Sequence, residues 1–413
     1  MKTLLFVSRI FAGLVFVFSG FVKAVDPSGS AIKFEEYFLS FHLDFLVFAA
    51  LPLAVILSAA ELMIGLNLLA GLRMRITAFL LLIFMSFFTV LTFILALTNP
   101  VSDCGCFGDA LILTNWQTFW KNIILLVPTL FIFIHRERYS RFAAPSLEWG
   151  LTGINFLLAV LVSAWCLRHQ PLLDFRPYTV GASIPEKMSV PEGAPADVYH
   201  TILVYERNGV RQEFTESNFP WQDSTWKWVE TRQTLLKKGY EPPIHDFSIT
   251  DEEGLELTER ILQDSSYTFL IVAPFLEKAS GKGLQRMNDL ALRASDLGFP
   301  VYCLTSSPTH QIGEFKETFQ PAFQVCTTDE TTLKTIIRAN PGLLVLREGI
   351  ILGKWNHADI PDPKDIRSDF MSYLMERHRR SGERTALVIL ALSVLVFYCM
   401  VTCFKSLRSP HQQ

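Results

Sequence analysis

Residues 76–98 read ITAFLLLIFMSFFTVLTFILALT, and this stretch contains no charged side chain. A helix needs about 20 mostly apolar residues to cross the hydrocarbon core of a bilayer, so the stretch predicts a membrane-spanning helix. The composition agrees, because half of the 413 residues are apolar and only 19% are charged. Soluble domains usually carry about 25% charged residues. We therefore expect an integral membrane protein with a soluble part, and the lipid bilayer as a partner.

Five further stretches have the length and composition of spanning helices. They are Leu4–Val22, Phe45–Gly71, Gln117–Ile134, Leu147–Leu167 and Thr385–Phe404. The first stands where a signal peptide would stand, but no small-residue cleavage site follows it, and Lys23 and Asp26-Pro27 come next. We expect it to be retained, which gives six spanning helices in all.

Basic residues near the helix ends predict the orientation, because cytoplasmic loops are enriched in Lys and Arg. The basic loops hold Arg73, Arg75, Arg136, Arg138 and Arg141. Segment 23–44 is net acidic and segment 99–116 has no Lys or Arg, so both are expected outside. Both termini are then cytoplasmic, and residues 174–384 lie outside. One cluster before the last helix departs from this pattern: Arg377, Arg379, Arg380 and Arg384.

Several classes of function find no support in the sequence. The net charge of −3 argues against nucleic acid as a partner, because nucleic-acid binding needs a basic face. Phosphate-binding loops, dinucleotide fingerprints, zinc-protease motifs and serine nucleophile elbows are missing. No metal is expected, because zinc takes four ligands and neither His42 nor His135 has a Cys or His pair near it in the sequence.

Two of the seven cysteines, Cys104 and Cys106, stand together in an outer loop that reads DCGCFG over residues 103–108. An exterior compartment permits disulfides. Gly105 allows the tight turn that a bond between them needs, and the small ring is expected to be strained. Strained, exposed disulfides tend to be the labile or catalytic ones. We expect a switchable thiol pair, with Asp103 shifting a thiol pKa or moving a proton. A structural disulfide and two idle thiols are the alternatives.

Glu61 is a carboxylate within a predicted spanning helix. Such a group is costly in a membrane and usually marks a function. It is expected either to handle protons or to form a structural ion pair with Arg9 or Lys23. Arg9 lies near a helix end, from which a long side chain can also reach the membrane surface.

These residues resemble those of the DoxX/MauE group of small, redox-associated membrane proteins. The matching positions are Arg9, Gly13, Gly20, Lys23, Asp26-Pro27, Glu61, Gly65, and the loop residues Cys104, Gly105, Cys106, Phe107 and Gly108. The resemblance covers residues 1–140 and implies a four-helix bundle, to which this chain adds two spanning helices. The group is linked with electron transfer to or from quinones and with maturation of a disulfide-rich methylamine dehydrogenase subunit. It implies a thiol redox role in a bacterial inner membrane, with a quinone as non-covalent cofactor and residues 174–384 in the periplasm.

The segment 174–384 carries most of the charge. Residues 199–206 and 211–214 read as a hairpin with Asn208-Gly209 at the turn. A Trp-rich segment follows at 219–228, which is expected to form a packed loop or a short helix. Further strands are expected at 247–249, 267–273, 301–304, 342–346 and 350–355, and helices at 257–263, 280–297 and 333–339. Strands that alternate with helices predict an α/β or α+β sandwich.

Residues 240–360 resemble a thioredoxin-like domain of the TlpA/peroxiredoxin kind. Pro243–Gly254 resembles the entry into that fold, and Pro341 stands at its cis-proline position. The Cys-x-x-Cys of the fold is missing, because Leu276 and Ala279 occupy its positions. A thiolate at a helix N-terminus is the nucleophile of thioredoxin chemistry, so this domain is expected to bind a client rather than to oxidise or reduce it.

Two cysteines of this domain lie elsewhere. Cys303 falls in an apolar strand and is expected in the core. Cys326 precedes a polar Thr-Thr-Asp stretch, and we expect a loop in which it could be exposed.

The sequence thus predicts five segments: a DoxX/MauE-like bundle (1–142), a fifth helix and linker (143–173), a hairpin with a Trp-rich extension (174–239), a degenerate thioredoxin-like domain (240–376), and a sixth helix with its tail (377–413). One functional hypothesis is a quinone-linked thiol-disulfide oxidoreductase, in which Cys104 and Cys106 pass reducing equivalents between the membrane and an extracytoplasmic protein client. Glu61 or Asp103 would handle protons. The alternative is a non-catalytic, membrane-anchored binding or assembly factor.

Overall fold

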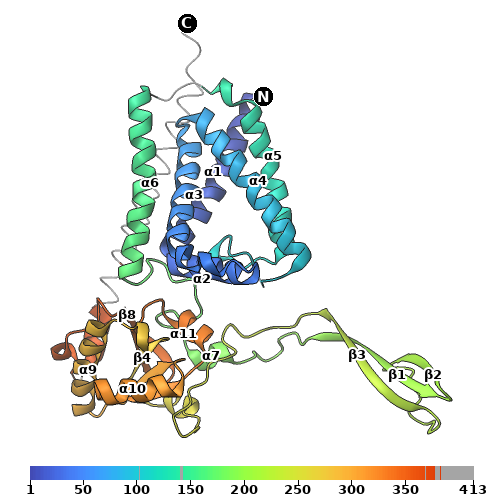
Figure 1. The fold of residues 1–413 in the computed structure, drawn as a ribbon, viewed down its shortest axis with the longest axis vertical. Helices are drawn as coiled ribbons and strands as arrows, with labels where there is room; N and C mark the ends of the chain where they lie inside the picture. Colours follow the sequence, from blue (N-terminus) through green and yellow to red (C-terminus); the bar gives the residue numbers. More distant parts are fainter. Residues whose placement is uncertain (102, 140–142, 368, 377–381, 383–413) are drawn as a thin grey trace. The chain divides into compact units, whose positions relative to one another are not determined.

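The computed structural model describes residues 1–413 except 102, 140–142, 368, 377–381 and 383–413 (Figure 1). The sixth predicted spanning helix and the basic cluster before it lie outside the described residues. The chain divides into two compact units, one of Met1–Gly181 with Ser248–Gln413 and one of Ala182–Phe247. The first unit contains the long helices and the larger of two sheets.

Five helices in the described part of the chain are long and apolar enough to cross a membrane. They are α1 (Lys2–Val25), α3 (Ala50–Ala70) with the 3-10 turn η1 (Asp44–Ala49) before it, α4 (Met74–Thr98), α5 (Asn115–Ile134) and α6 (Pro145–Arg168). The 3-10 turn η3 (Arg136–Arg138) follows α5. These helices confirm the first five predicted spans, with ends that differ by at most three residues when η1 is counted with α3. Large side chains on their outer surfaces, such as Phe79, Phe87 and Leu161, are exposed, as expected of helices that are apolar all round.

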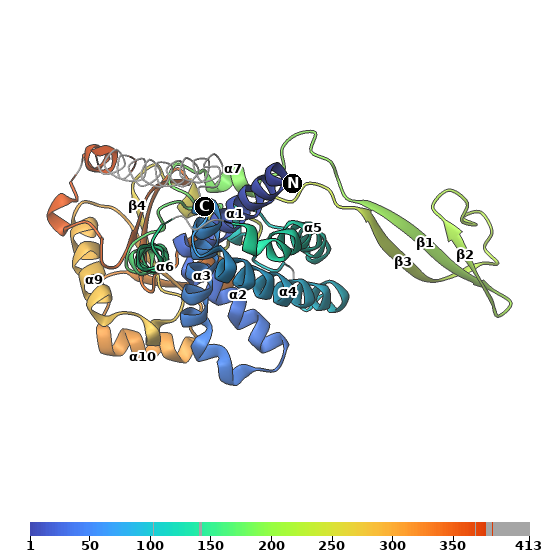
Figure 2. The ribbon, with the colours of Figure 1, turned by 90° about the horizontal axis from the view of Figure 1, so that it is seen from above.

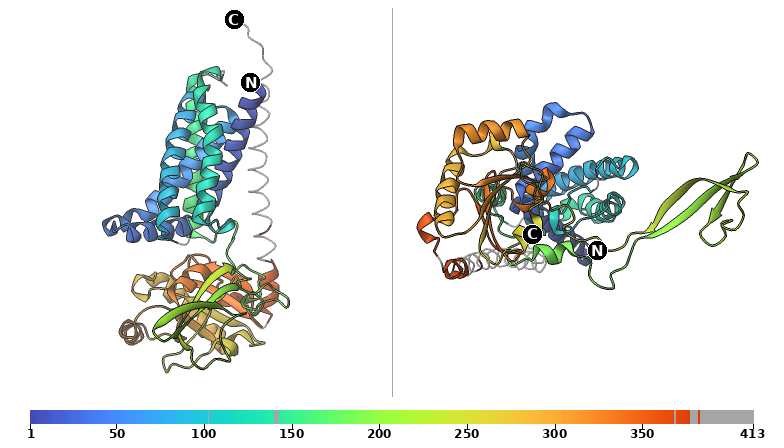
Figure 3. Two further views of the ribbon diagram at one scale, coloured as in Figure 1. Left: turned by 90° about the vertical axis from the view of Figure 1, so that its right-hand side faces the viewer. Right: turned by 90° about the horizontal axis from the view of Figure 1, so that it is seen from below.

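A shorter helix, α2 (Pro27–Ser40), lies across the end of the bundle where α1 ends (Figures 1 and 3). The acidic segment 23–44 is expected outside the membrane from its composition, but a helix within it was not predicted. Asp26 caps it, because Asp26 Oδ1 accepts a hydrogen bond from the Gly29 amide at 2.9 Å. Pro27 takes the first helical position, where no amide hydrogen is required.

Small residues let α1 and α3 approach closely. A Cβ atom on Gly20 would lie 2.4 Å from the backbone nitrogen of Leu62, and one on Gly65 would lie 2.6 Å from that of Val17. Contacts of this kind between small residues are typical of helices packed in membranes. The two glycines therefore fix the separation of the helices that carry Lys23 and Glu61.

A larger residue at Gly20 should push these helices apart. We expect Gly20→Val to lower the free energy of unfolding by about 1–3 kcal/mol, the usual cost of overpacking. Thermal unfolding of the full-length protein in detergent measures this. Gly150→Val is the matched control, because Gly150 is an exposed helical position with nothing within 4 Å of an added Cβ. Equal melting temperatures for the two variants would show that the close approach does not matter.

The larger sheet has five strands in the order β6-β5-β4-β7-β8. The strands are β4 (Thr268–Val272), β5 (Val301–Thr305), β6 (Gln324–Thr327), β7 (Gly342–Arg347) and β8 (Ile350–Asn356). Strands β4, β5 and β6 are parallel, whereas β7 runs antiparallel to β4 and to β8. The helical elements around them are α8 (Thr258–Leu262), η4 (Leu276–Lys278), α9 (Gly281–Asp296), α10 (Thr309–Phe319), α11 (Glu330–Ile336) and η5 (Pro363–Asp365). This is the predicted α/β, thioredoxin-like arrangement, and the Asn340–Pro341 bond is cis.

The core of this region forms between the sheet and α9. Met287 and Leu290 on α9 are fully buried together with Phe269 on β4 and Phe370 near the end of the described chain. The predicted helix at 280–297 and the strands at 267–273, 301–304, 342–346 and 350–355 are confirmed.

Two expectations for this region are wrong. Cys326 lies in β6 and is fully buried, not in an exposed loop, because the strand begins two residues before it and pairs with β5. Residues 247–249 form no strand, although Thr250 makes isolated bridges to Glu256 and Thr327. The helix α10, between β5 and β6, was not predicted.

The second unit contains the short helix α7 (Ile184–Met188) and a three-stranded antiparallel sheet in the order β2-β1-β3 (Figure 2). The strands are β1 (Val198–Arg207), β2 (Val210–Thr215) and β3 (Lys227–Lys237). The predicted hairpin is confirmed, with positive φ at Asn208 and Gly209 in its turn. The Trp-rich segment is a loop as far as Trp226, which packs against Phe214 with ring centres 5.2 Å apart. The expected packing is wrong for Trp221, which is 72% exposed, and for Trp228, which is 60% exposed and belongs to β3.

Candidate functional site

The cysteine loop joins α4 to α5 and ends in the 3-10 turn η2 (Gly108–Ala110). Gly105 has a φ of +62°, in the left-handed region that favours glycine, so the backbone makes the tight turn that the sequence predicts. The turn places the Cys106 amide 3.3 Å from the Cys104 sulfur. Both residues are half-buried and are free thiols in this structure.

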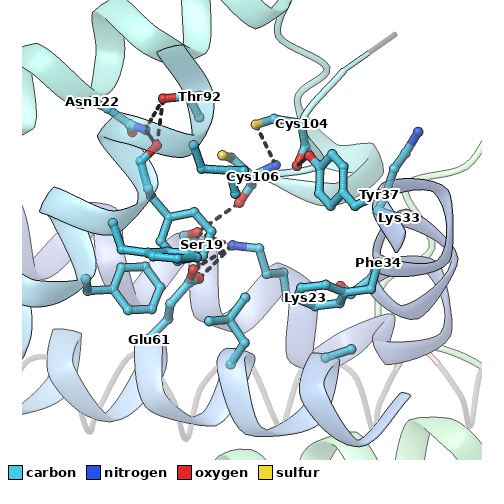
Figure 4. Close-up of a pocket in the computed structure, with 18 of the residues that line it drawn as sticks. Ser19, Lys23, Lys33, Phe34, Tyr37, Glu61, Thr92, Cys104, Cys106 and Asn122 are labelled. Atoms are coloured by element: carbon cyan, nitrogen blue, oxygen red, sulfur yellow. Dashed lines mark hydrogen bonds and ion pairs between the residues drawn. The ribbon is translucent and has the colours of Figure 1, made fainter. Parts of the chain in front are cut away.

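Both cysteines line a cavity of about 600 Å³ within the bundle (Figure 4). Most of the wall is apolar and includes Phe16, Phe34, Phe38, Phe84, Phe88 and Leu125. Ile56 on α3 and Ile83 and Phe87 on α4 also line it, although they are 55%, 51% and 62% exposed on the outer surface. The cavity therefore reaches the apolar surface of the bundle between α3 and α4.

Helix α2 and the first turn of α5 hold the loop in place. The Tyr37 hydroxyl donates a hydrogen bond of 2.6 Å to the carbonyl oxygen of Cys104. The Cys104 thiol lies 3.5 Å from the Thr118 hydroxyl. Asp103 accepts a hydrogen bond from the Gly105 amide at 2.9 Å and forms an ion pair of 3.1 Å with Lys33. The Asp103 carboxylate is thus bound to α2 and to its own turn.

A buried polar network lies next to the loop, as Figure 4 shows. Lys23 Nζ is 2.8 and 2.7 Å from the two carboxylate oxygens of Glu61, and the two side chains are 8% and 4% exposed. Ser19 Oγ lies 2.8 Å from Glu61 and 2.9 Å from the carbonyl oxygen of Cys106. Of the two partners considered for Glu61, the structure selects Lys23. Ser19 connects this ion pair to the backbone of Cys106.

The pKa values of the two thiols are shifted in opposite directions. The pKa of Cys106 is lowered to about 6, first because the Cys104 thiol donates a hydrogen bond to it. Burial opposes this shift, while the positive charges of Lys121 and Lys23 support it. The same hydrogen bond, together with burial, raises the pKa of Cys104. Cys106 is therefore the sulfur that carries negative charge near neutral pH.

Not every residue chosen from the sequence lies here. Arg9 is 4% exposed and lies at the other end of the bundle, 5.5 Å from the centre of the Tyr139 ring, so its charge does not reach the surface. Pro341 belongs to the α/β region. Phe107 is at the site and packs against Phe18, with ring centres 5.4 Å apart. The Gly108 backbone approaches α1 nearby, because an added Cβ would lie 3.2 Å from Val22.

Sequence reasoning missed four residues of the site. Ser19 precedes Lys23 by one helical turn, and this spacing was available as a signal. Lys121 is a charge within a predicted spanning helix, which was also a signal. Tyr37 and Thr118 gave none, because their positions depend on α2 and on the way α5 begins.

The α/β region has no thiol where a thioredoxin needs one. Leu276 is 5% exposed in η4, and Ser280 caps α9 by accepting a hydrogen bond from the Gly283 amide at 3.2 Å. Cys303 and Cys326 are fully buried in neighbouring strands. Within the described residues, no group of three or more Cys, His, Asp or Glu side chains could hold a metal ion.

Fold and site together define a polytopic membrane protein with a thiol pair beside an apolar cavity and with an α/β domain. Residues 1–135 match the family described as methylamine utilisation protein MauE, and residues 199–238 match one described as a domain of unknown function (DUF8463). Among curated proteins, none matches the chain. Among solved structures, a candidate protein disulfide isomerase from Bacteroides thetaiotaomicron shares 16% identity over 32% of this chain and 84% of that one, with a TM-score of 0.24.

Proposed function

We propose that this protein is a membrane thiol oxidoreductase that exchanges reducing equivalents between Cys104 and Cys106 and a lipid-soluble quinone. One observation carries the proposal: both half-buried thiols line an apolar cavity that reaches the lipid-facing surface between α3 and α4. A substrate that approaches through this opening must be soluble in the bilayer. The match of residues 1–135 to MauE supports a role in the membrane.

The cavity suits a quinone ring. Its volume of about 600 Å³ falls within the usual range of small-molecule sites, about 300–1,000 Å³. Aromatic side chains such as Phe16, Phe34 and Phe84 can pack against a flat ring, and the opening between α3 and α4 can pass an apolar tail. When bound, a quinone supplies the capacity to accept two electrons and two protons.

The thiol pair supplies those electrons and protons. As the Cys104–Cys106 sulfur–sulfur bond forms, two electrons would leave for the quinone. The two protons needed for a quinol would be the one that Cys106 released when it ionised and the one that the Cys104 thiol loses as the bond forms. Cys106, which holds the negative charge, is the better nucleophile. Ser19 contacts both the Cys106 carbonyl oxygen and Glu61, so Glu61 can hold a proton one residue away from Cys106.

A client protein completes the cycle. A client thiolate attacks the oxidised pair, a mixed disulfide forms, and the second client thiol releases it, so that the client is oxidised and the loop pair is reduced. We place this exchange on the outer side of a bacterial inner membrane. The arginine-rich loops at 73–75 and 136–138 support this orientation, because they lie at the opposite end of the bundle from the cysteine loop.

Reconstitution tests the proposal. Full-length protein is reduced, freed of reductant, and placed in liposomes that contain decylubiquinone. We expect about one quinol to form per chain. The ultraviolet absorbance of the quinone measures this yield, and mass-tag labelling should show the loss of two thiols. Protein-free liposomes are the control. Quinol formation no faster than in that control would overturn the proposal.

A second function, that of a membrane-anchored binding or assembly factor, is favoured by the α/β region itself. Its topology is that of a thioredoxin-like domain, yet Leu276 and Ala279 stand where the thiols belong. Such a surface can bind a client protein without exchanging thiols and disulfides with it. This function predicts that a double Cys104→Ser/Cys106→Ser variant still captures the client, whereas a purely redox function predicts that it does not.

A further inference from the structure

The cavity is lined by three lysines, and they differ in how their charges are balanced. Lys23 is neutralised by Glu61, with contacts of 2.7 and 2.8 Å. Lys33 forms ion pairs of 2.9 Å with Glu36 and 3.1 Å with Asp103. Lys121 has no hydrogen bond and no carboxylate partner among the residues that the structure describes. It is half-buried and lies within α5, one turn and a half after its start.

An unpaired ammonium group inside a membrane helix is costly, and such groups usually pair with an anion. The ammonium of Lys121 lies 4.5 Å from the centre of the Phe107 ring, and Phe107 is the residue next to Cys106. Lys121 and Cys106 line the same cavity. The anion within its reach is a thiolate of the loop.

We propose that Lys121 is a positioning residue that supplies the countercharge of the Cys106 thiolate, an inference that rests on the proposed function of the loop pair. Its positive charge favours the form of Cys106 that attacks. It also keeps the cavity neutral when that form is present. When the sulfur–sulfur bond forms, Cys106 loses its negative charge. The ammonium group of Lys121 then has no anionic partner at the loop.

Other charged or titratable groups face the loop from each packed element, and the test must separate them. They are Lys23 on α1, Lys33 and Tyr37 on α2, Glu61 on α3, Lys121 on α5, and Asp103 and Cys104 in the loop itself. Among these, Lys23 and Glu61 cancel each other, and Lys33 is bound by two acids. Lys121 is therefore the positive charge in this set that no carboxylate among the described residues balances.

The experiment measures the reactivity of Cys106 against pH. Reduced full-length protein in liposomes is alkylated with iodoacetamide between pH 5 and 9, and modification of Cys106 is read by peptide mass spectrometry. We expect Lys121→Met to move the midpoint of alkylation upward by about one pH unit, with about a tenfold lower rate below the midpoint. Lys121→Arg should restore the wild-type midpoint. Lys2→Met, which removes the same charge at the far end of α1, should leave it unchanged.

Three results would overturn the inference: an unchanged midpoint in Lys121→Met, an equal shift in Lys2→Met, or no rescue by Lys121→Arg. Lys121→Gln serves as a second neutral variant, and thermal unfolding verifies that each variant is folded. The alkylation assay needs no quinone. An upward shift without any quinone reduction by the wild type would thus overturn the proposed function alone, and an unchanged midpoint with normal quinone reduction would overturn this inference alone.

Discussion

Cys104→Ser and Cys106→Ser should each lower quinone reduction by at least about 100-fold, while the protein still inserts into the membrane. The reason is that a two-electron oxidation needs both sulfurs, and neither serine oxygen can form the bond. Initial rates of quinol formation in liposomes measure the effect. Cys166→Ala is the matched control, because Cys166 is buried on α6, outside the cavity lining, and should leave the rate within about twofold of wild type.

The two serine variants should differ in what they trap. In Cys104→Ser the remaining Cys106 still lies near Lys121 and Lys23, so it should form a mixed disulfide with a model dithiol readily. In Cys106→Ser the remaining thiol is Cys104. Burial raises the pKa of Cys104, so less of it is thiolate and it should react more slowly. Non-reducing electrophoresis after acid quenching compares the two adducts. A faster adduct in Cys106→Ser would reverse the roles assigned here, and near-normal quinone reduction in either variant would contradict the redox function itself.

Glu61→Gln should be the most destabilising single substitution in the site. It leaves the Lys23 ammonium buried with no carboxylate, and breaking a buried ion pair in this way costs about 3–5 kcal/mol. Thermal unfolding in detergent measures the loss. The double variant Lys23→Met/Glu61→Gln removes both charges and should recover most of the stability, because the amide can still bind Ser19. A stable Glu61→Gln protein would show that the pair does not lock α1 to α3.

The same double variant separates a structural lock from proton handling. If Glu61 also takes a proton from the thiols, the double variant is stable but reduces quinone at least about 10-fold more slowly. Glu61→Asp tests the proton-transfer role further, because it keeps a carboxylate on a side chain that is shorter by one methylene. Partial quinone reduction by Glu61→Asp would support proton transfer to the carboxylate. A double variant with wild-type rate and stability would leave the pair with no role in catalysis.

The parts of this protein that sequence predicts well are those whose signal is local. Twenty apolar residues in a row specify a spanning helix without any knowledge of its neighbours. Cys104 and Cys106 are one residue apart, so their proximity and the role of Gly105 can be seen in the sequence. The α/β region follows for the same reason, because its buried strands are short apolar runs set between amphipathic helices.

The missing parts depend on partners that are distant in the sequence. Helix α2 has a local signal, because Asp26-Pro27 begins it and Ala31, Phe34 and Phe38 recur at helical spacing. The surface on α3 that this apolar face packs against is distant in the sequence, and Tyr37 cannot be assigned to the site without that contact. Strand β6 has few apolar residues and is stabilised by pairing with β5, which is why Cys326 was misplaced. Strand β3 is largely polar and exposed, and it forms by pairing with β1.

The redox state of the loop pair in living membranes tests the central claim most directly. Cells that make the full-length protein are quenched with acid, free thiols are labelled with a maleimide mass tag, and wild type is compared with Cys104→Ser and Cys106→Ser. We expect a mixture of dithiol and disulfide at Cys104 and Cys106 that becomes more reduced when quinone is depleted and more oxidised when quinone is restored. A pair that stays fully oxidised at every level of quinone would contradict it and identify a structural bridge.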